Sequence, residues 1–492
     1  MSAYDDYKTL RNKIRKFSAI SIVSLCITKL HEIAKIDLTE SPNYLPWELL
    51  FLLKIAFIEG GTNGTKTATI NGVNKFLNQI KDLPTHEEFF DGTTTGIYKF
   101  FRIMSFQQFM FQKKLASYDI ARQIVIYQDA SDRLKQSFES ITGMPISTYL
   151  QFFIALWVSF CMELNAQYIT KSNLKEIGSD QQIDSFLDSV SLDLADAREF
   201  LIHHYSLTPE KLLQVTEQSP LKRFPLLLAD NKYYCYYPYL LQDRFTHVIY
   251  DLLKENDKQD FTHEFGSLFE TYIYKLMGTT GLNYKVEDEL KRLFPGKRVC
   301  DALIELDDII VLLEIKGVEM HPSAQINPTN AIMTQQLQTS IVKSFEQLYD
   351  LTYTLHNTPE GRIICDGKNV YAIVVTYKEM YLSNGEDLWN EFLAGPLLEY
   401  ICRKGLNKDL LPPQNILFSS VKSFEFLIKI LIHDYSVLSG LIQKVVQDNS
   451  DPSTKKHLFD MYLSKYEGKP IQFLDDVYHE IFEDLISKLR GK

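Results

Sequence analysis

Cysteine is scarce in this sequence, and the cysteines lie far apart. The 492 residues include six, and none forms a Cys-x-x-Cys pair: Cys26, Cys161, Cys235, Cys300, Cys365 and Cys402. Free thiols in a reducing compartment are the simplest interpretation of this spacing. The zinc-protease pattern His-Glu-x-x-His is also absent, and His203-His204 has no carboxylate or cysteine at ligand spacing nearby.

Long hydrophobic runs are absent as well. The longest run, Tyr149–Met162, contains Gln151 and Ser159 and is shorter than the roughly 20 residues that a membrane helix needs. It predicts a buried helix. The N-terminal stretch MSAYDDYKTLRNKIRKF is charged and lacks the apolar core of a secretory signal. We therefore expect a cytoplasmic protein without membrane contact.

Positive charge is in deficit, since the formal net charge is −11. Any nucleic-acid binding must therefore come from local basic patches. Residues 97–140 carry seven basic and four acidic side chains among many aromatics, and Lys8–Lys16 has five basic residues in nine. Each segment is either a nucleic-acid surface or an amphipathic helix with a solvated basic face. For 97–140 the amphipathic helix is favoured.

The length predicts more than one domain. Residues 1–250 show apolar spacing of three and four residues and predict an α-helical domain for assembly or nucleic-acid contact. The polar segment Asp251–Asp260 is the expected boundary. The second domain is expected at 251–425, beginning with this segment, and a helical extension at 426–492. Gly60–Thr67 resembles a phosphate-binding loop, but Thr65 occupies the position where such a loop needs glycine, so an interhelical loop is favoured.

The most informative stretch is Cys300–Gly317, which predicts two apolar strands around the tight turn Asp307-Asp308. A two-residue turn pairs Leu306 with Ile309, and the same register places Asp301 opposite Glu314. Directly opposed carboxylates repel each other, so a cation is expected between them. Oxygen ligands of this kind suit Mg²⁺ or Mn²⁺.

Asp301 and, after twelve intervening residues, Glu314-Ile315-Lys316 together resemble the signature of the PD-(D/E)xK, or restriction-endonuclease-like, nucleases. Cys300 stands where that signature has proline. His263–Tyr272, with Glu270, resembles the first core helix of the family. Lys343–Tyr349, with Gln347, resembles the helix after the motif, and Val370–Thr376 resembles the next strand. The resemblance implies an α+β or α/β fold with a mixed sheet flanked by helices.

The resemblance also implies roles for individual residues. Asp301, Glu314, Glu270 and the Ile315 carbonyl would hold one or two Mg²⁺ or Mn²⁺ ions, and Lys316 would assist catalysis. The expected nucleic-acid contacts are Lys297, Arg298, Lys343 and Gln347. Residues 261–350 carry eight basic against thirteen acidic side chains, so the substrate must also be held elsewhere.

The predicted activity is that of a Mg²⁺-dependent endonuclease, with DNA a more usual substrate of the family than RNA. A nuclease domain joined to a helical half resembles effectors of bacterial anti-phage defence, and a homo-oligomer or a complex with a partner subunit is expected. An RNA-cleaving nuclease and a non-catalytic assembly protein built on the same fold are the alternatives.

Overall fold

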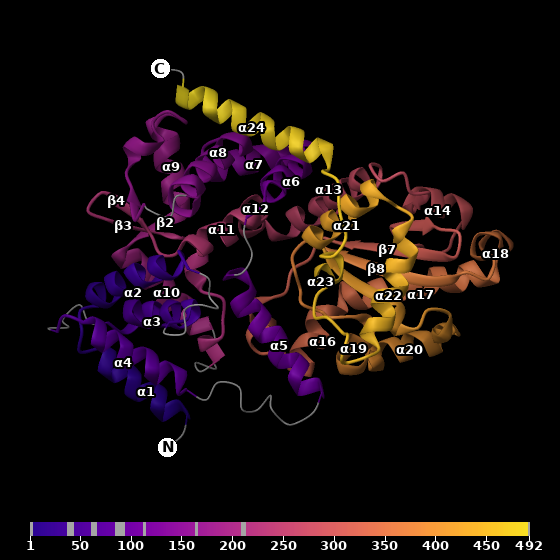
Figure 1. Ribbon diagram of the computed structural model, residues 1–492, viewed down its shortest axis with the longest axis horizontal. Helices are drawn as coiled ribbons and strands as arrows, with labels where there is room; N and C mark the ends of the chain where they lie inside the picture. The colour runs from indigo at the N-terminus through magenta and orange to yellow at the C-terminus, as the bar shows by residue number, and fades with distance from the viewer. Residues whose placement is uncertain are drawn as a thin grey trace. The chain divides into compact units, whose positions relative to one another are not determined.

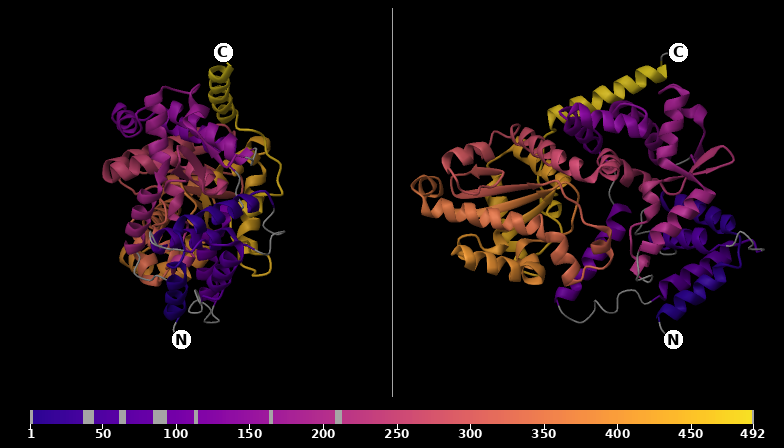
Figure 2. Two further views of the ribbon diagram at one scale, coloured as in Figure 1. Left: turned by 90° about the vertical axis from the view of Figure 1, so that its left-hand side faces the viewer. Right: turned by 180° about the vertical axis from the view of Figure 1, so that it is seen from behind.

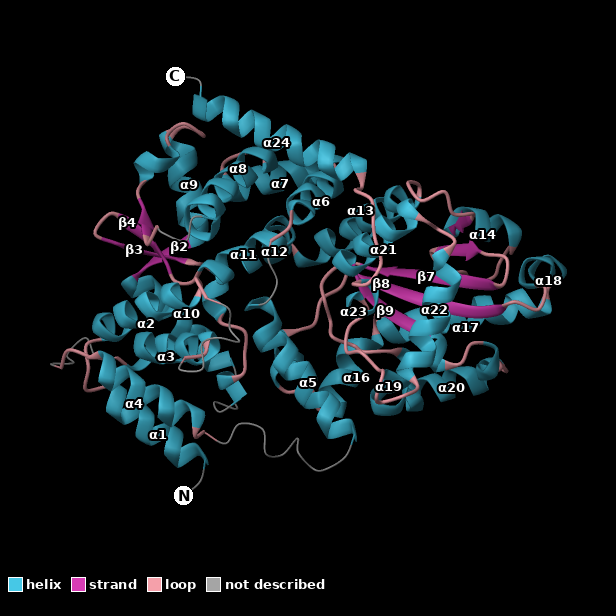
Figure 3. Ribbon diagram, viewed as in Figure 1, coloured by secondary structure: helices cyan, strands magenta, loops and turns pink. Residues whose placement is uncertain are grey.

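The computed structural model describes residues 3–36, 44–60, 66–83, 94–111, 115–162, 166–207 and 213–490. The chain divides into two compact units (Figure 1). The first unit comprises Met1–Ile124, Ser131–Lys258 and Asp476–Lys492, and the second comprises Val125–Ala130 and Gln259–Asp475. Each unit combines helices with one small sheet, so the coarse α+β class is confirmed (Figure 3).

The first unit is mainly helical, as the apolar spacing predicted. Its helices are α1 (Ala3–Ile14), α2 (Ala19–Ile33), α3 (Pro46–Glu59), α4 (Ile70–Lys81), α5 (Thr94–Gln108), most of α6 (Ser117–Gln128), α7 (Asp132–Thr142), α8 (Ile146–Trp157), α9 (Asp180–Val190), α10 (Leu194–Leu207), α11 (Pro238–Thr246), α12 (Val248–Asn256) and the greater part of α24 (Gln472–Arg490). Residues 61–65 of the predicted loop Gly60–Thr67 lie outside the described residues.

A four-stranded sheet, which the sequence did not predict as a whole, also belongs to the first unit. Its strands are β1 (Tyr168–Ile169), β2 (Ser191–Asp193), β3 (Leu226–Ala229) and β4 (Lys232–Cys235), in the order β1-β4-β3-β2. The hairpin from β3 to β4 turns at Asp230 and Asn231, whose φ angles of 50° and 58° suit a tight two-residue turn. Strands of two to four residues are too short to show a period of two in the sequence.

The apolar run Tyr149–Met162 forms most of α8 and a π-helical turn after it, and most of its side chains on α8 are buried. Its one buried polar side chain, Gln151, is paired on both sides by α24: it donates to Asp484 Oδ2 at 2.5 Å and accepts from Lys488 Nζ at 2.7 Å. No single described helix has the length and apolarity of a membrane span, although α7 and α8 with its π-turn, bent by 45°, meet those criteria as a pair.

The basic and aromatic segment 97–140 has the buried pattern of amphipathic helices. Arg102 is 1% exposed and Arg122 is fully buried, and Arg122 Nη2 lies 2.6 Å from Asp119 Oδ1. Phe106 and Phe111 are buried too. Lys113 and Lys114 lie outside the described residues. This segment therefore offers fewer free cations than its composition suggested.

The second unit is built on a five-stranded mixed sheet. Its strands, in sheet order, are β5 (Tyr284–Val286), β6 (Ala302–Glu305), β7 (Ile309–Lys316), β8 (Asn369–Thr376) and β9 (Ile416–Ser420). The pairs β5–β6 and β6–β7 are antiparallel, whereas β7–β8 and β8–β9 are parallel. The carboxyl ends of β7, β8 and β9 therefore meet at one edge of the sheet.

Helices flank this sheet (Figure 3). They are α13 (Lys258–Met277), α14 (Glu287–Leu293), α15 (Pro322–Ile326), α16 (Asn330–Gln338), α17 (Ile341–Asn357), α18 (Pro359–Cys365), α19 (Gly385–Leu388), α20 (Ala394–Lys404), α21 (Val421–His433), α22 (Val437–Asn449) and α23 (Asp460–Leu463). The predicted order of helix, hairpin, helix and strand is present as α13, β6–β7, α17 and β8. β5 and α14, which precede the hairpin, were not predicted.

The predicted domain limits 1–250, 251–425 and 426–492 differ in detail from the division into units. The segment Asp251–Asp260 is helical on both sides of Asp257, and the units divide after Lys258. The predicted extension 426–492 is shared, because α22 and α23 belong to the second unit and α24 belongs to the first from Asp476 onward. The limits drawn from composition stay predictions.

Candidate active site

The hairpin of β6 and β7 carries the candidate site. The Leu306 N–H donates to the Ile309 carbonyl at 3.1 Å, so Asp307-Asp308 forms the two-residue turn. The strands pair antiparallel in the register that this turn dictates. Continued by one residue, the same register places Asp301 opposite Glu314, as the sequence predicted.

Three charged side chains meet where β7 ends. Lys316 Nζ lies 2.6 Å from Glu314 Oε2 and 3.8 Å from Asp301 Oδ2. Asp301 Oδ2 also accepts a hydrogen bond from the Ile315 N–H at 2.5 Å. The Glu314 side chain is fully buried, and its Oε1 atom has no hydrogen-bond partner among the residues that the structure describes. One lysine thus faces two buried carboxylates.

This arrangement shifts the proton affinities of all three groups. Burial, reinforced by the nearby Asp301 charge, raises the pKa of Glu314 well above its usual range. Burial also raises the pKa of Asp301, although Lys316 and the Ile315 N–H oppose the shift. For Lys316, burial lowers the pKa, but Glu314 and Asp301 outweigh that effect and the net shift is upward. The raised pKa values of both carboxyl groups indicate that Lys316 alone does not fully compensate their negative charge.

Glu270 joins this group from α13. Burial, followed by repulsion from Asp301, raises its pKa to about 7, and Lys316 opposes the rise. One turn further along α13, the Tyr274 hydroxyl donates to the Asp301 carbonyl oxygen at 2.9 Å. This bond connects α13 to the start of β6. Tyr274 was not predicted from the sequence, although its position four residues after Glu270 placed both on one helix face.

Gly317 lets α13 approach the end of β7. A Cβ atom at Gly317 would lie 2.9 Å from Cδ1 of Phe265, which is closer than packed carbon atoms come. The Phe265 ring in turn packs on Tyr377, with 4.7 Å between the ring centroids. Gly266, the neighbour of Phe265 on α13, has open space where its Cβ would be. Glycine is therefore required at position 317 but not at position 266.

The predicted nucleic-acid contacts fall into two groups. Arg298 and Gln347 are engaged within the protein: Arg298 Nη1 donates to Glu346 Oε2 at 3.0 Å, and Gln347 Nε2 donates to the Val299 carbonyl at 3.4 Å. Both bonds fasten α17 to the segment that precedes Asp301. Lys297 and Lys343 are exposed. Arg298 and Gln347 thus help to position the site, while Arg298 is, like the two lysines, exposed.

The donor set fits a divalent cation by chemistry. Asp301, Glu314, Glu270 and the backbone of Ile315 supply oxygen atoms, which Mg²⁺ and Mn²⁺ prefer, and Glu314 Oε1 has no partner within the described structure. Across the described ranges, however, no three His, Cys, Asp or Glu side chains are gathered as a metal-binding group. Lys316 lies where it neutralises both carboxylates, through Glu314 Oε2 and Asp301 Oδ2, so a bound cation would compete with its ammonium for these two oxygens.

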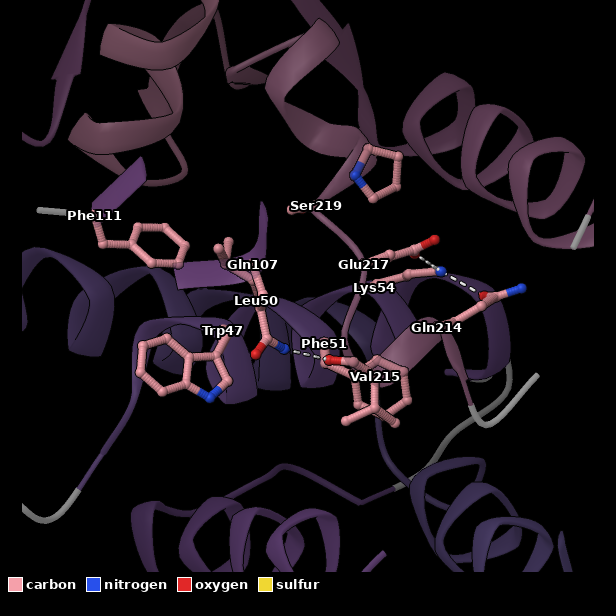
Figure 4. Close-up of a pocket in the computed structure, with 11 residues that line it drawn as sticks. Trp47, Leu50, Phe51, Lys54, Gln107, Phe111, Gln214, Val215, Glu217 and Ser219 are labelled. Carbon is pink, nitrogen blue, oxygen red and sulfur yellow. Dashed lines mark hydrogen bonds and ion pairs between the residues drawn. The ribbon is translucent and has the colours of Figure 1, made fainter. Parts of the chain in front are cut away.

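A second buried polar cluster lies in the first unit, where α3 meets residues 214–217. Lys54 lies between Gln214 and Glu217 and contacts both (Figure 4). Glu217 Oε2 also lies 3.3 Å from His204 Nε2. The cavity beside this cluster has a free volume of about 10 Å³, which is room for one water molecule. We interpret the cluster as a structural ion pair that fixes α3.

No protein-family model matches this chain, and no curated protein is significantly similar to it.

Proposed function

We propose that this chain is a divalent-metal-dependent nuclease that hydrolyses phosphodiester bonds, most often in DNA. The observation that carries the proposal is the fully buried Glu314, which faces Asp301 with Lys316 as the nearest cation. Buried charges cost stability unless they are paired, and two opposed carboxylates share one ammonium here. Such an arrangement is expected where a cation site serves a function.

Each residue has a role in this proposal. Asp301, Glu314, Glu270 and the Ile315 carbonyl hold Mg²⁺ or Mn²⁺, which when bound acidifies a water molecule and neutralises phosphate charge. Lys316, released from Glu314, offers its ammonium to a phosphate oxygen or orients the attacking water. Glu270, which has a pKa of about 7 in the metal-free site, would release its proton on binding the metal.

The biological setting we propose is bacterial anti-phage defence in the cytoplasm. There the helical first unit would serve assembly, in a homo-oligomer or with a partner subunit. This setting rests on the resemblance of the domain combination alone.

The test is a cleavage assay on plasmid DNA and on single-stranded RNA, run side by side with the full chain. We expect cleavage in Mg²⁺ or Mn²⁺ and none in EDTA, with DNA cut faster than RNA. Faster cleavage of RNA would reassign the substrate. Cleavage that persists in EDTA would contradict the metal site.

A non-catalytic assembly protein is the second candidate. The Lys316–Glu314 ion pair favours it, because that pair lowers the electrostatic cost of the buried carboxylate without a metal. This candidate predicts no cleavage of either substrate with any divalent ion, so the same assay separates the two functions.

A further inference from the structure

The candidate site carries an excess of acidic residues, so a nucleic acid needs a basic surface elsewhere on the chain. The first unit has such a surface. We call it the α1–α4 basic face and define it by six residues from the end of α1, the segment before α4, and α4 itself: Arg11, Lys13, Arg15, Lys16, Lys66 and Lys75. α1 and α4 lie side by side in Figures 1 and 2.

Contacts within the protein make this face continuous. Lys13 Nζ donates to Gln79 Oε1 at 3.1 Å and joins α1 to α4. Lys75 lies four residues before Gln79, on the same side of α4. The Lys66 N–H donates to the Lys16 carbonyl at 3.4 Å, so these two lysines are neighbours through their backbones. Segments separated by about fifty residues are thus joined, and each contributes exposed lysines.

The face is strongly positive. Arg15 Nη2 lies 2.5 Å and Arg11 Nε lies 3.8 Å from the Glu59 carboxylate, so two arginines share one acid. Glu59 is the one acidic side chain in contact with the six basic residues, within the described part of the chain. The side chains of Lys16, Lys66 and Lys75 are exposed and form no ion pair there. With the exposed Asp6 of α1 and Asp82 directly after α4, six positive charges stand against three negative charges, so the local excess is positive in a chain whose net charge is −11.

The simpler explanation is that basic residues near the C-terminus of α1 interact favourably with its helix dipole. This accounts for Lys13 and Lys16. It does not account for Lys75, which lies in the middle of α4, or for Lys66, which precedes that helix. A cluster of unpaired lysines also repels itself, so its assembly from separate segments calls for an external anion.

We propose that the α1–α4 basic face binds the phosphate backbone of double-stranded DNA without reading its sequence. The choice of DNA rests on the proposed nuclease function, whereas the requirement for a polyanion rests on the charges alone. Lysine ammonium groups act as point charges toward phosphate, which suits contact that does not depend on sequence.

The experiment measures binding of a fluorescein-labelled DNA duplex to the full chain by fluorescence anisotropy, in EDTA, over a range of salt concentrations. Each lysine–phosphate contact contributes about 0.9 to the slope of log affinity against log salt. The variant Lys13→Gln/Lys16→Gln/Lys66→Gln/Lys75→Gln should therefore lower that slope by about 3 to 4 and weaken binding at least tenfold at low salt. The matched control changes four other exposed lysines and should leave the slope unchanged: Lys175→Gln/Lys404→Gln/Lys408→Gln/Lys469→Gln.

Thermal melting of each variant shows whether it is folded as stably as the wild type. If the fourfold variant melts early, Lys66→Gln/Lys75→Gln replaces it, because it breaks no ion pair or side-chain hydrogen bond in the described structure, and its slope should fall by about 2. A slope equal to that of the wild type, or an equal loss in the control, overturns the proposal. Stronger binding of an RNA duplex overturns the assignment to DNA.

Failure of this proposal is distinguishable from failure of the nuclease. Binding in EDTA does not depend on catalysis. Wild-type protein that binds through this face but cleaves nothing refutes the nuclease and supports the face. Wild-type protein that cleaves DNA, alongside a fourfold variant that binds as well as wild type, refutes the face alone.

Discussion

Lys316 Nζ lies 2.6 Å from Glu314 Oε2, and this ion pair is the main compensation for a carboxylate without solvent exposure. Asp301, 3.8 Å from the same ammonium, depends on it as well. The stability of the hairpin and the availability of the site are therefore coupled through one lysine.

Lys316→Met should destabilise the protein at neutral pH by about 3 to 5 kcal/mol, because it leaves buried carboxylates without their cation. The pKa of Glu314 is raised in the folded state, so its protonated form favours folding and the loss should shrink as pH falls toward about 5. Denaturant unfolding at the two pH values measures both effects.

The matched control for this variant is Lys368→Met, which removes a partly exposed lysine 3.5 Å from Glu305. It should cost less than about 1 kcal/mol, as surface pairs do. If both variants cost the same, Lys316 has no special role in neutralising the site.

Lys316→Arg tests catalysis apart from folding. Arginine keeps the positive charge and should leave the free energy of unfolding close to that of the wild type. Its planar guanidinium replaces the compact ammonium poorly beside a phosphate and a water molecule. We expect cleavage to fall by about two to three orders of magnitude. Unchanged cleavage rates in this variant would remove Lys316 from the chemistry.

Replacing Glu270 with glutamine should change the free energy of unfolding in a direction that the raised pKa of Glu270 determines. Its folded-state pKa of about 7 exceeds the ordinary value of 4.5, so the protonated group favours folding and that contribution disappears as pH rises through 7. In metal-free buffer, Glu270→Gln should therefore be more stable than wild type at about pH 8, by about 1 to 3 kcal/mol, and equal to it below about pH 4.

Urea unfolding in EDTA across this pH range measures the difference. A variant that is less stable than wild type at high pH would show that Glu270 makes a favourable charged contact instead. Added Mg²⁺ should reverse the order at high pH, because the wild-type carboxylate then has a cation to bind.

Gly317 and Gly266 form a matched pair of substitutions. Gly317→Ala puts a Cβ atom 2.9 Å from the Phe265 ring and should destabilise by about 1 to 3 kcal/mol, because α13 or the ring must move. Gly266→Ala meets no atom within 4 Å and should stabilise the helix by about 0.5 to 1 kcal/mol. Calorimetric melting distinguishes the two. Equal effects would refute the close approach of α13 to β7.

The sequence predicted the hairpin well because its information is local. Two acidic turn residues between apolar strands determine the register, and the register alone determines that Asp301 faces Glu314. The helix with Glu270 and the strand after α17 were predictable from apolar spacing. The charge balance around the site was not predictable from the sequence, because the hydrogen bond from Arg298 to Glu346 joins segments almost fifty residues apart.

Other features lay beyond sequence patterns for similar reasons. The strands β1, β2 and β5 have two or three residues each, and pairing with distant partners defines them. Gln151 is interpretable only once Asp484 and Lys488 of α24 are beside it. Likewise, the continuity of the α1–α4 basic face depends on the contact of Lys13 with Gln79, which composition does not reveal.

The most direct test of the central claim compares three proteins on plasmid DNA in Mg²⁺: wild type, Glu314→Gln and Glu305→Gln. Glu305 lies on the same hairpin but pairs with Lys285 and Lys368 at the surface. The Glu305→Gln variant is therefore the matched control. We predict that wild type and Glu305→Gln cleave at similar rates and that Glu314→Gln cleaves at least a hundredfold more slowly, about the effect of losing one charge-stabilising group. Cleavage by Glu314→Gln at the wild-type rate would contradict the proposed site.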